Sequence, residues 1–263
     1  MNTKSNKFRT FYLSLFFVAL YVPVLSVVLY SFNKSSSTAQ WTGFTLDWYI
    51  QLLNDRVIFE SFKISIQVAI ITSVISAIIG TASAIISSYV SNKTESAING
   101  VMFLPLIIPE VALGLSLLIF FSELNLTFGL PTLVLGHSLF CVPYIYFMVQ
   151  LRLREIDISI IEAAKDLGAS KCQIIKTVLL PLVIPSTLTG SLLAFAMSLD
   201  DVIISTYMAG PTGTTLPVHI FSMMRTGVTP KVNALSTLFL LGTFLLIGLN
   251  QIVGRKGENY YEE

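Results

Sequence analysis

Charged residues are scarce in this sequence, and their scarcity excludes several classes of protein. Asp, Glu, Lys and Arg make up 12% of the 263 residues, against roughly 25% in ordinary soluble domains. A water-soluble fold of this length would need more polar residues to cover its surface. The formal net charge of +1 and the lack of a basic stretch give no indication of nucleic acid as a partner.

Motifs for catalysis, metal binding and nucleotide binding are also absent. Cys141 lies in an apolar run and Cys172 in a charged segment, so they suggest neither a disulfide framework nor a metal site. No HExxH, GxSxG or Walker GxxxxGK[ST] pattern occurs. We therefore expect no catalytic residue, no metal and no ATP site in this chain. We interpret His137 as satisfied within a helix bundle and His219 as lying on an external loop.

What the sequence has instead is long apolar runs. Residues 10–33, 64–92 and 232–254 carry no charge, and residues 96–151 and 177–224 carry only four acids. A helix needs about 20 apolar residues to cross a bilayer. The fold class we expect is an all-α membrane protein, with one transmembrane domain over residues 1–263. Its six predicted transmembrane helices lie at about 11–32, 64–90, 101–121, 132–151, 183–208 and 233–253.

Lys and Arg are unevenly distributed between the segments that join these spans. If the N-terminus is cytoplasmic, eleven of them lie on the inner side and five on the outer side. The positive-inside rule then predicts that both termini are cytoplasmic. The first apolar stretch is about twice too long for a cleaved signal peptide, so we expect an uncleaved signal anchor.

Two further features concern local irregularity. The external segment 33–62 contains WTGFTLDWYIQLL, which is read equally well as a short interfacial helix or as a plain loop. Six prolines lie near span ends or interrupt the spans, so we expect the third and fifth spans to be irregular. These prolines are Pro105, Pro109, Pro181, Pro185, Pro211 and Pro217.

The cytoplasmic segment 152–180 holds the densest charge in the chain. Two capping boxes, Ser159 to Glu162 and Ser170 to Gln173, predict two helix starts there. Gly168, between them, is suited to the left-handed residue that ends a helix. We therefore expect two short helices joined by a sharp turn.

The first of these helices is predicted to have an apolar face. Ile160, Ala163, Ala164 and Leu167 recur at helical spacing, and Glu162, Lys165 and Asp166 flank them. Small alanines let another surface approach closely. The face is equally suited to a groove on a soluble partner and to the protein's own cytoplasmic surface.

The same segment resembles the EAA loop of ABC importer permeases, whose pattern is EAA, three residues, G, nine residues, I, one residue and LP. Every fixed position agrees except that valine replaces the isoleucine, a change of one methylene. The matching residues are Glu162, Ala163, Ala164, Gly168, Val178, Leu180 and Pro181.

This resemblance implies the MetI-like permease fold, with residues 162–168, including Asp166, inserted into a cleft on a cytoplasmic ATPase. It implies a second similar permease, two ATPase subunits that bind ATP and Mg²⁺, and an extracytoplasmic substrate-binding protein, in a bacterial inner membrane. The stretches FLPLIIPEVALGLSLL, SLDDVIIST and LPVHIFSMMRTGVTPKVNALST look like the spermidine/putrescine branch, in particular its second permease subunit. No cofactor is expected in this chain, and membrane lipid is its expected surroundings.

Three acids lie inside predicted spans, and no Lys or Arg lies near them in sequence. An ionisable residue there costs about 2.5–3.5 kcal/mol, so it usually faces a cavity or a partner. Glu110 lies nine residues into the third span, roughly 14 Å deep if the helix is straight. Asp200 and Asp201 point about 100° apart on a helix, so we expect one to face a cation path and the other to cap or brace. Tyr207 would add an aromatic wall.

Other interpretations remain open at this point. The acids can instead hydrogen-bond neighbouring helices or the second permease. Importers of iron, sulfate, molybdate or thiamine share the same loop, although we would expect an anion importer to line its path with bases. A self-sufficient secondary transporter is a further alternative, and it leaves the capped cytoplasmic segment unexplained.

Overall fold

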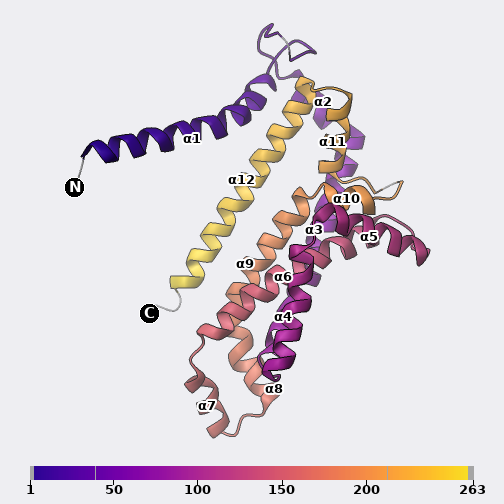
Figure 1. Cartoon of the computed structure of the whole chain (residues 1–263). Helices are drawn as coiled ribbons and strands as arrows, with labels where there is room; N and C mark the ends of the chain where they lie inside the picture. Colours follow the sequence, from indigo (N-terminus) through magenta and orange to yellow (C-terminus); the bar gives the residue numbers. More distant parts are fainter. Residues whose placement is uncertain (1–2, 39, 212, 260–263) are drawn as a thin grey trace. The chain divides into compact units, whose positions relative to one another are not determined.

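The computed structural model describes residues 3–38, 40–211 and 213–259, and most of them are helical (Figure 1). No β-strand occurs among the described residues; one isolated bridge joins Asn33 and Phe44. The helices are α1 (Thr3–Tyr30), α2 (Asp47–Leu53), α3 (Arg56–Ser87), α4 (Asn92–Ile107), α5 (Glu110–Glu123), α6 (Leu130–Glu155), α7 (Ile158–Asp166), α8 (Lys171–Ile174), the π-helix η1 (Ile175–Leu179), α9 (Leu180–Asp200), α10 (Ile203–Met208), α11 (Leu216–Thr226) and α12 (Pro230–Asn259).

Among the described residues, four helical stretches are long and apolar enough to cross a membrane: Tyr12–Tyr30, Arg56–Ser87, Leu130–Glu155 and Lys171–Asp200. The pair α4 and α5 makes a fifth if it is counted as one broken span. The all-α membrane class is confirmed, but the count of six is not. The sixth predicted span, 233–253, lies on α12, where the side chains of residues 246–247 and 249–259 are outside the described part.

The third predicted span is broken, as expected from its prolines. Ile108 and Pro109 are both extended, with ψ near 129° and 131°, and α4 and α5 meet there at 103°. Proline disfavours the helical conformation in the residue before it, so Ile108 ends α4. The fifth predicted span, 183–208, is also interrupted. Its helix ends at Asp200 rather than at a proline, Asp201 is extended, and α10 starts at Ile203.

Two local expectations can be compared directly with the structure. The short helix in the external segment is confirmed as α2, where the Trp48 indole donates to the Asn33 carbonyl oxygen at 2.8 Å. The loop position of His219 is wrong, because this residue lies in α11. Pro217 stands at the second position of that helix, where the missing N–H costs nothing, so it begins a helix instead of breaking one.

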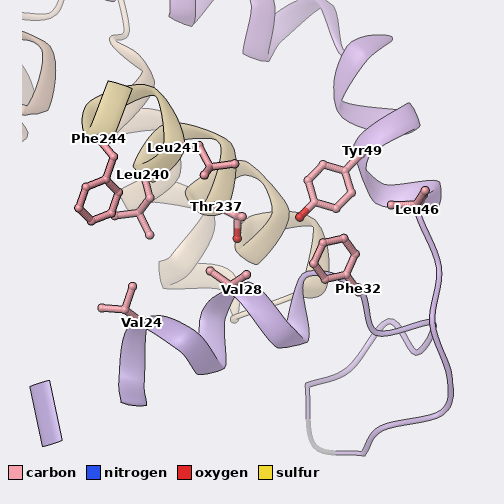
Figure 2. A pocket seen from close by; sticks show the side chains of 9 residues that line it. All are labelled: Val24, Val28, Phe32, Leu46, Tyr49, Thr237, Leu240, Leu241 and Phe244. Carbon is pink, nitrogen blue, oxygen red and sulfur yellow. The ribbon is translucent and has the colours of Figure 1, made fainter. Parts of the chain in front are cut away.

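The chain divides into two compact units, and the first comprises residues 1–59 and 220–244. Within it, Lys231 donates to the Asp55 carboxylate at 2.8 Å. This hydrogen bond lowers the pKa of Asp55 below its ordinary value. This unit also holds an apolar groove of about 300 Å³, and Figure 2 shows the side chains that line it. Its lining residues are Val24, Val28, Phe32, Leu46, Tyr49, Thr237, Leu240, Leu241 and Phe244.

The second unit comprises residues 60–219 and 245–263, and α6 is its central helix. Helices α4, α9 and α10 pack against α6, and α10 also packs against α5. Two hydrophobic clusters form the core. The Val68 cluster contains Val68, Leu113, Phe121, Leu133, Val134, Ile204 and Met208. The Ile145 cluster contains Ala84, Ile85, Cys141, Ile145, Tyr146, Val149, Val183 and Ala194.

Glycine lets α10 approach α6 closely. A Cβ placed on Gly136 would lie 2.8 Å from Ile204 Cγ2 and 3.1 Å from Met208 Cγ. One turn earlier on α6, the buried Thr132 hydroxyl donates to the Met208 carbonyl oxygen at 3.0 Å. These contacts hold α10 against α6 through the side chains of Ile204 and Met208 and through the carbonyl oxygen of Met208.

We predict that Gly136→Ala lowers the melting temperature of the purified protein. The added methyl group overpacks the contact with Ile204, which typically costs about 1–3 kcal/mol. Gly100→Ala is the matched control, because nothing lies within 4 Å of a Cβ there. Equal melting temperatures for the two variants would contradict the close contact between α6 and α10.

Candidate functional site

The break between α9 and α10 contains two adjacent acids in different environments. Asp201 is extended, with φ −67° and ψ 128°, and its carboxylate turns back onto α10. It accepts hydrogen bonds from the backbone N–H groups of Ser205, at 2.6 Å, and Ile204, at 3.3 Å. Asp201 therefore satisfies free donors at the start of α10, as a capping residue does.

A fully buried histidine from α6 completes this arrangement. His137 Nε2 lies 3.3 Å from the Asp201 carboxylate and 3.0 Å from the Ser205 hydroxyl. Its Nδ1 lies 2.7 Å from the hydroxyl of Ser198 on α9. The expectation that His137 is satisfied inside the bundle is confirmed. Its partner Asp201 could not be read from the sequence, because the two residues are far apart along the chain.

The two acids differ sharply in exposure. The Asp201 side chain is 7% exposed, whereas Asp200 is exposed. Asp200 makes no hydrogen bond and no ion pair with any other described residue. Asp201 therefore caps α10 and contacts His137, whereas Asp200 is exposed and has no hydrogen bond or ion pair among the described residues.

Glu110 lies at a different kind of position from the one expected. It is the first residue of α5, directly after the bend, and its carboxylate is exposed. The depth of roughly 14 Å assumed a straight helix, and that assumption is wrong because α4 ends at Ile107. A carboxylate in the first turn of a helix is favoured by the helix dipole, so Glu110 has a local structural reason to be there.

Tyr207 is partly buried and packs against α5. A Cβ on Gly114 would lie 2.5 Å from the Tyr207 ring, so the ring rests directly on the glycine. Gly114 is one turn after Glu110. The structure therefore brings Tyr207 beside the first turns of α5, whereas no hydrogen bond or ion pair joins Glu110 to Asp200 or Asp201 among the described residues.

The charged segment 152–180 comprises the end of α6, then α7, α8 and η1, and the first residue of α9. Helices α7 and α8 lie together at one end of the second unit (Figure 1). The turn between them is as predicted: Gly168 has φ +81°, and its N–H donates to the Lys165 carbonyl oxygen at 2.8 Å. The capping box at Ser170 and Gln173 is confirmed. The capping box predicted from Ser159 to Glu162 is wrong.

Helix α7 is capped by Asp157 instead. Its carboxylate accepts from the Ser159 N–H at 2.9 Å, which lowers the pKa of Asp157. Asp157 lies two residues before Ser159, so the helix starts earlier than the sequence pattern suggested. The Ser159 side chain therefore contacts the capping carboxylate of Asp157 instead of capping α7 itself.

The apolar face of α7 is uncovered within the described chain. Leu167 is 89% exposed, Ile160 is 45% exposed, and Ala163 is also exposed, with Ala164 half-buried. Glu162, Asp166 and Gly168 are exposed beside it. Of the two interpretations left open by the sequence, packing on the protein's own surface does not occur among these residues.

A second polar network joins α4 to α6. The Tyr146 hydroxyl, fully buried, donates to the Asn99 side-chain oxygen at 2.6 Å. Gln150 donates to the same oxygen at 3.0 Å and to Glu95 at 3.3 Å. Arg154 donates to Glu95 at 3.1 Å. Sequence reasoning missed this network, which clamps the first half of the broken span to α6.

The apolar groove of the first unit and a groove of the second unit are both lined without a carboxylate. The groove in the first unit is aliphatic and aromatic, apart from the hydroxyls of Thr237 and Tyr49 (Figure 2). A groove of about 480 Å³ in the second unit lies between α3 and the start of α9. Its lining residues are Ala77, Ile78, Thr81, Ala82, Ile85, Ile86, Ile175, Leu180, Ile184 and Thr187. Within the described part of the chain, no group of three or more His, Cys, Asp or Glu residues is arranged to hold a metal.

Comparison with known proteins adds an independent line of evidence. Residues 76–257 match the family model described as "Binding-protein-dependent transport system inner membrane component". The chain is 34% identical to the spermidine/putrescine transport system permease protein PotC of Haemophilus influenzae, covering 95% of this chain and 98% of that protein. It is 39% identical to the putrescine transport system permease protein PotI of Escherichia coli, covering 91% and 88%.

A solved structure shows the same fold. It is a bacterial ABC transporter involved in the import of the acidic polysaccharide alginate, matched with a TM-score of 0.73. The match covers 97% of this chain and 95% of that one, at 12% sequence identity. Since that transporter is involved in importing an acidic polymer, the shared fold carries no information about the substrate.

The site predicts different effects on stability for its two neighbouring acids. Asp201→Asn weakens the charge-assisted bonds from Ser205 and His137, so we expect a loss of about 1.5–3 kcal/mol in the free energy of unfolding. Asp200→Asn removes no described contact, so its effect should stay within about 0.5 kcal/mol. Thermal unfolding of the two purified variants in detergent measures the difference. A larger loss for Asp200→Asn would show that the two roles are reversed.

Proposed function

Because the chain belongs to the family of binding-protein-dependent transport system inner membrane components, we propose that it is a transmembrane permease subunit of an ATP-driven polyamine importer. The observation that supports the polyamine assignment most is the similarity over nearly the whole chain to permeases of spermidine and putrescine transport systems. The acids at the α9–α10 break suit the same substrate class, since a polyamine needs carboxylates or aromatic faces along its path.

In this proposal the complete importer has several other subunits. A second, similar permease completes the path, two ATPase subunits bind ATP and Mg²⁺, and an extracytoplasmic protein delivers the polyamine. Both termini of this chain are cytoplasmic, as its Lys and Arg distribution favours. The chain carries no Walker sequence, which supports a separate ATPase.

The coupling element of the proposed importer is α7 with its terminal glycine. Its support is the exposed apolar face beside Glu162 and Asp166, which leaves Ala163 accessible to a groove on the ATPase. Closure of the ATPase subunits on ATP moves this helix, and α8, η1 and α9 follow it directly in the chain. Alternating access then exposes the break between α9 and α10 to either side of the membrane.

The substrate path of the proposal begins with Asp200. Its exposed carboxylate has no described partner, so an ammonium group can pair with it without breaking an internal contact. Glu110 and Tyr207 lie on elements that pack together and are further candidates for the path. Asp201 contributes through its charge and its support of the break.

We predict that Glu162→Arg and Gly168→Pro uncouple ATP hydrolysis from transport in the assembled complex. The first reverses a charge beside the docking face, and the second forbids the left-handed conformation at φ +81°. Uptake should fall about tenfold or more, as for a lost charge-assisted contact, while the protein still inserts into the membrane. Glu123→Arg, at an exposed acid of α5, is the matched control. Normal uptake by both variants would disprove the docking assignment.

We also predict that Asp200→Asn raises the KM for spermidine about tenfold, because one charge-assisted hydrogen bond to the substrate is lost. Initial rates of ATP-dependent uptake into proteoliposomes that contain the complete importer measure this. Glu123→Gln neutralises an exposed acid elsewhere and should leave the KM unchanged. An unchanged KM in Asp200→Asn would remove this residue from the substrate path.

A further inference from the structure

The contacts around the break between α9 and α10 involve a histidine as well as the two acids. We infer that His137 is a positioning residue: it holds Asp201 inside the bundle, so that Asp200 alone presents its carboxylate to the substrate. This inference rests on the proposed function. It assigns a role in substrate binding to a fully buried side chain on α6 that does not touch the substrate.

The first support is the convergence of three elements on one imidazole. His137 stands on α6, its Nδ1 contacts Ser198 near the end of α9, and its Nε2 contacts Ser205 on α10. The two serines lie on opposite sides of the break, with Asp201 between them. A single ring therefore ties both flanks of the break to the central helix.

The second support is the direction of the hydrogen bonds. An ionised carboxylate only accepts, so Nε2 of His137 carries a proton and faces Asp201 and the Ser205 hydroxyl. The Ser198 hydroxyl, 2.7 Å from Nδ1, holds the other side of the ring and so fixes its orientation. A side chain without a donor at this position leaves the Asp201 carboxylate with the donors of α10 alone, which are Ser205 and the Ile204 N–H.

The third support is that the ring is held in place by packing. On α6, Val134 belongs to the Val68 cluster and Cys141 to the Ile145 cluster, so His137 lies between the two cores. Gly136, directly before it, lets Ile204 of α10 approach the helix backbone. The imidazole ring of His137 is therefore held in place by α6, and its contacts can fix the position of the break between α9 and α10.

The consequence for the substrate follows from charge. Two adjacent carboxylates repel each other if both face the same cavity. Binding Asp201 to His137 removes one of them from the surface, with 7% of its side chain exposed, and leaves Asp200 exposed. The substrate path then offers one exposed carboxylate, that of Asp200, instead of two that repel each other.

The test compares His137→Leu with His137→Gln in the complete importer reconstituted in proteoliposomes. For ATP-dependent spermidine uptake, we expect His137→Leu to raise the KM about tenfold, with Vmax per assembled complex within about twofold. Gln keeps an N–H donor, so it should recover part of the KM. His219→Gln, on α11, is the matched control and should behave as the unaltered protein.

A merely structural role gives a different result. It would reduce the amount of assembled complex, and hence the total uptake, without changing the KM, and Gln would rescue no better than Leu. That outcome overturns the inference. If His137→Leu does not assemble, Ser198→Ala decides: it removes the hydroxyl that holds Nδ1 of His137 at 2.7 Å, and an unchanged KM there overturns the inference as well.

A double-mutant comparison identifies the residue through which His137 acts. In an Asp201→Asn background, His137→Leu should raise the KM no further, because both changes remove the same contact. Additive effects would mean that His137 acts by another route and would refute the inference. If the unaltered complex takes up no spermidine, the proposed function fails. Uptake with a KM that none of these variants moves refutes the role of His137 alone.

Discussion

A membrane helix that breaks must satisfy its freed backbone groups from within the protein, because hydrocarbon offers no hydrogen-bond partner. At the break between α9 and α10, a small number of side chains meet this requirement. Asp201 accepts the N–H groups at the start of α10, and His137 holds Asp201 from α6. The close approach at Gly136 allows this geometry, because any larger residue would push α10 away. The position of Asp200 depends on this arrangement.

Helix α6 connects the break between α9 and α10 to the other end of the second unit. Along α6, His137 contacts α9 and α10, and further on Tyr146 and Gln150 hold α4 through Asn99. Helix α7 follows α6 after a short connection and presents an uncovered apolar face. In the proposed importer, a displacement of α7 by the ATPase would act on elements that are clamped together.

The sequence predicted those features that depend on local chemistry. Charge-free runs located the apolar helices, Gly168 marked the left-handed turn, and Pro109 marked the bend in the third span. It misplaced the cap of α7, because Asp157 and Ser159 are both good capping residues and only the backbone shows which one accepts. It could not pair His137 with Asp201, because that contact depends on how α6 packs against α9 and α10. The predicted depth of Glu110 is wrong because it assumed a straight helix, whereas Glu110 begins α5 directly after the bend.

The central claim is that this polypeptide moves polyamines only as part of an assembly driven by a separate ATPase. The most direct measurement is the uptake of labelled spermidine into vesicles, comparing this chain alone with the chain combined with the second permease, the ATPase and the binding protein. The account predicts uptake by the complete assembly, only when ATP is hydrolysed, and none by the chain alone. Uptake by the chain alone, or uptake by the assembly without ATP, would contradict it.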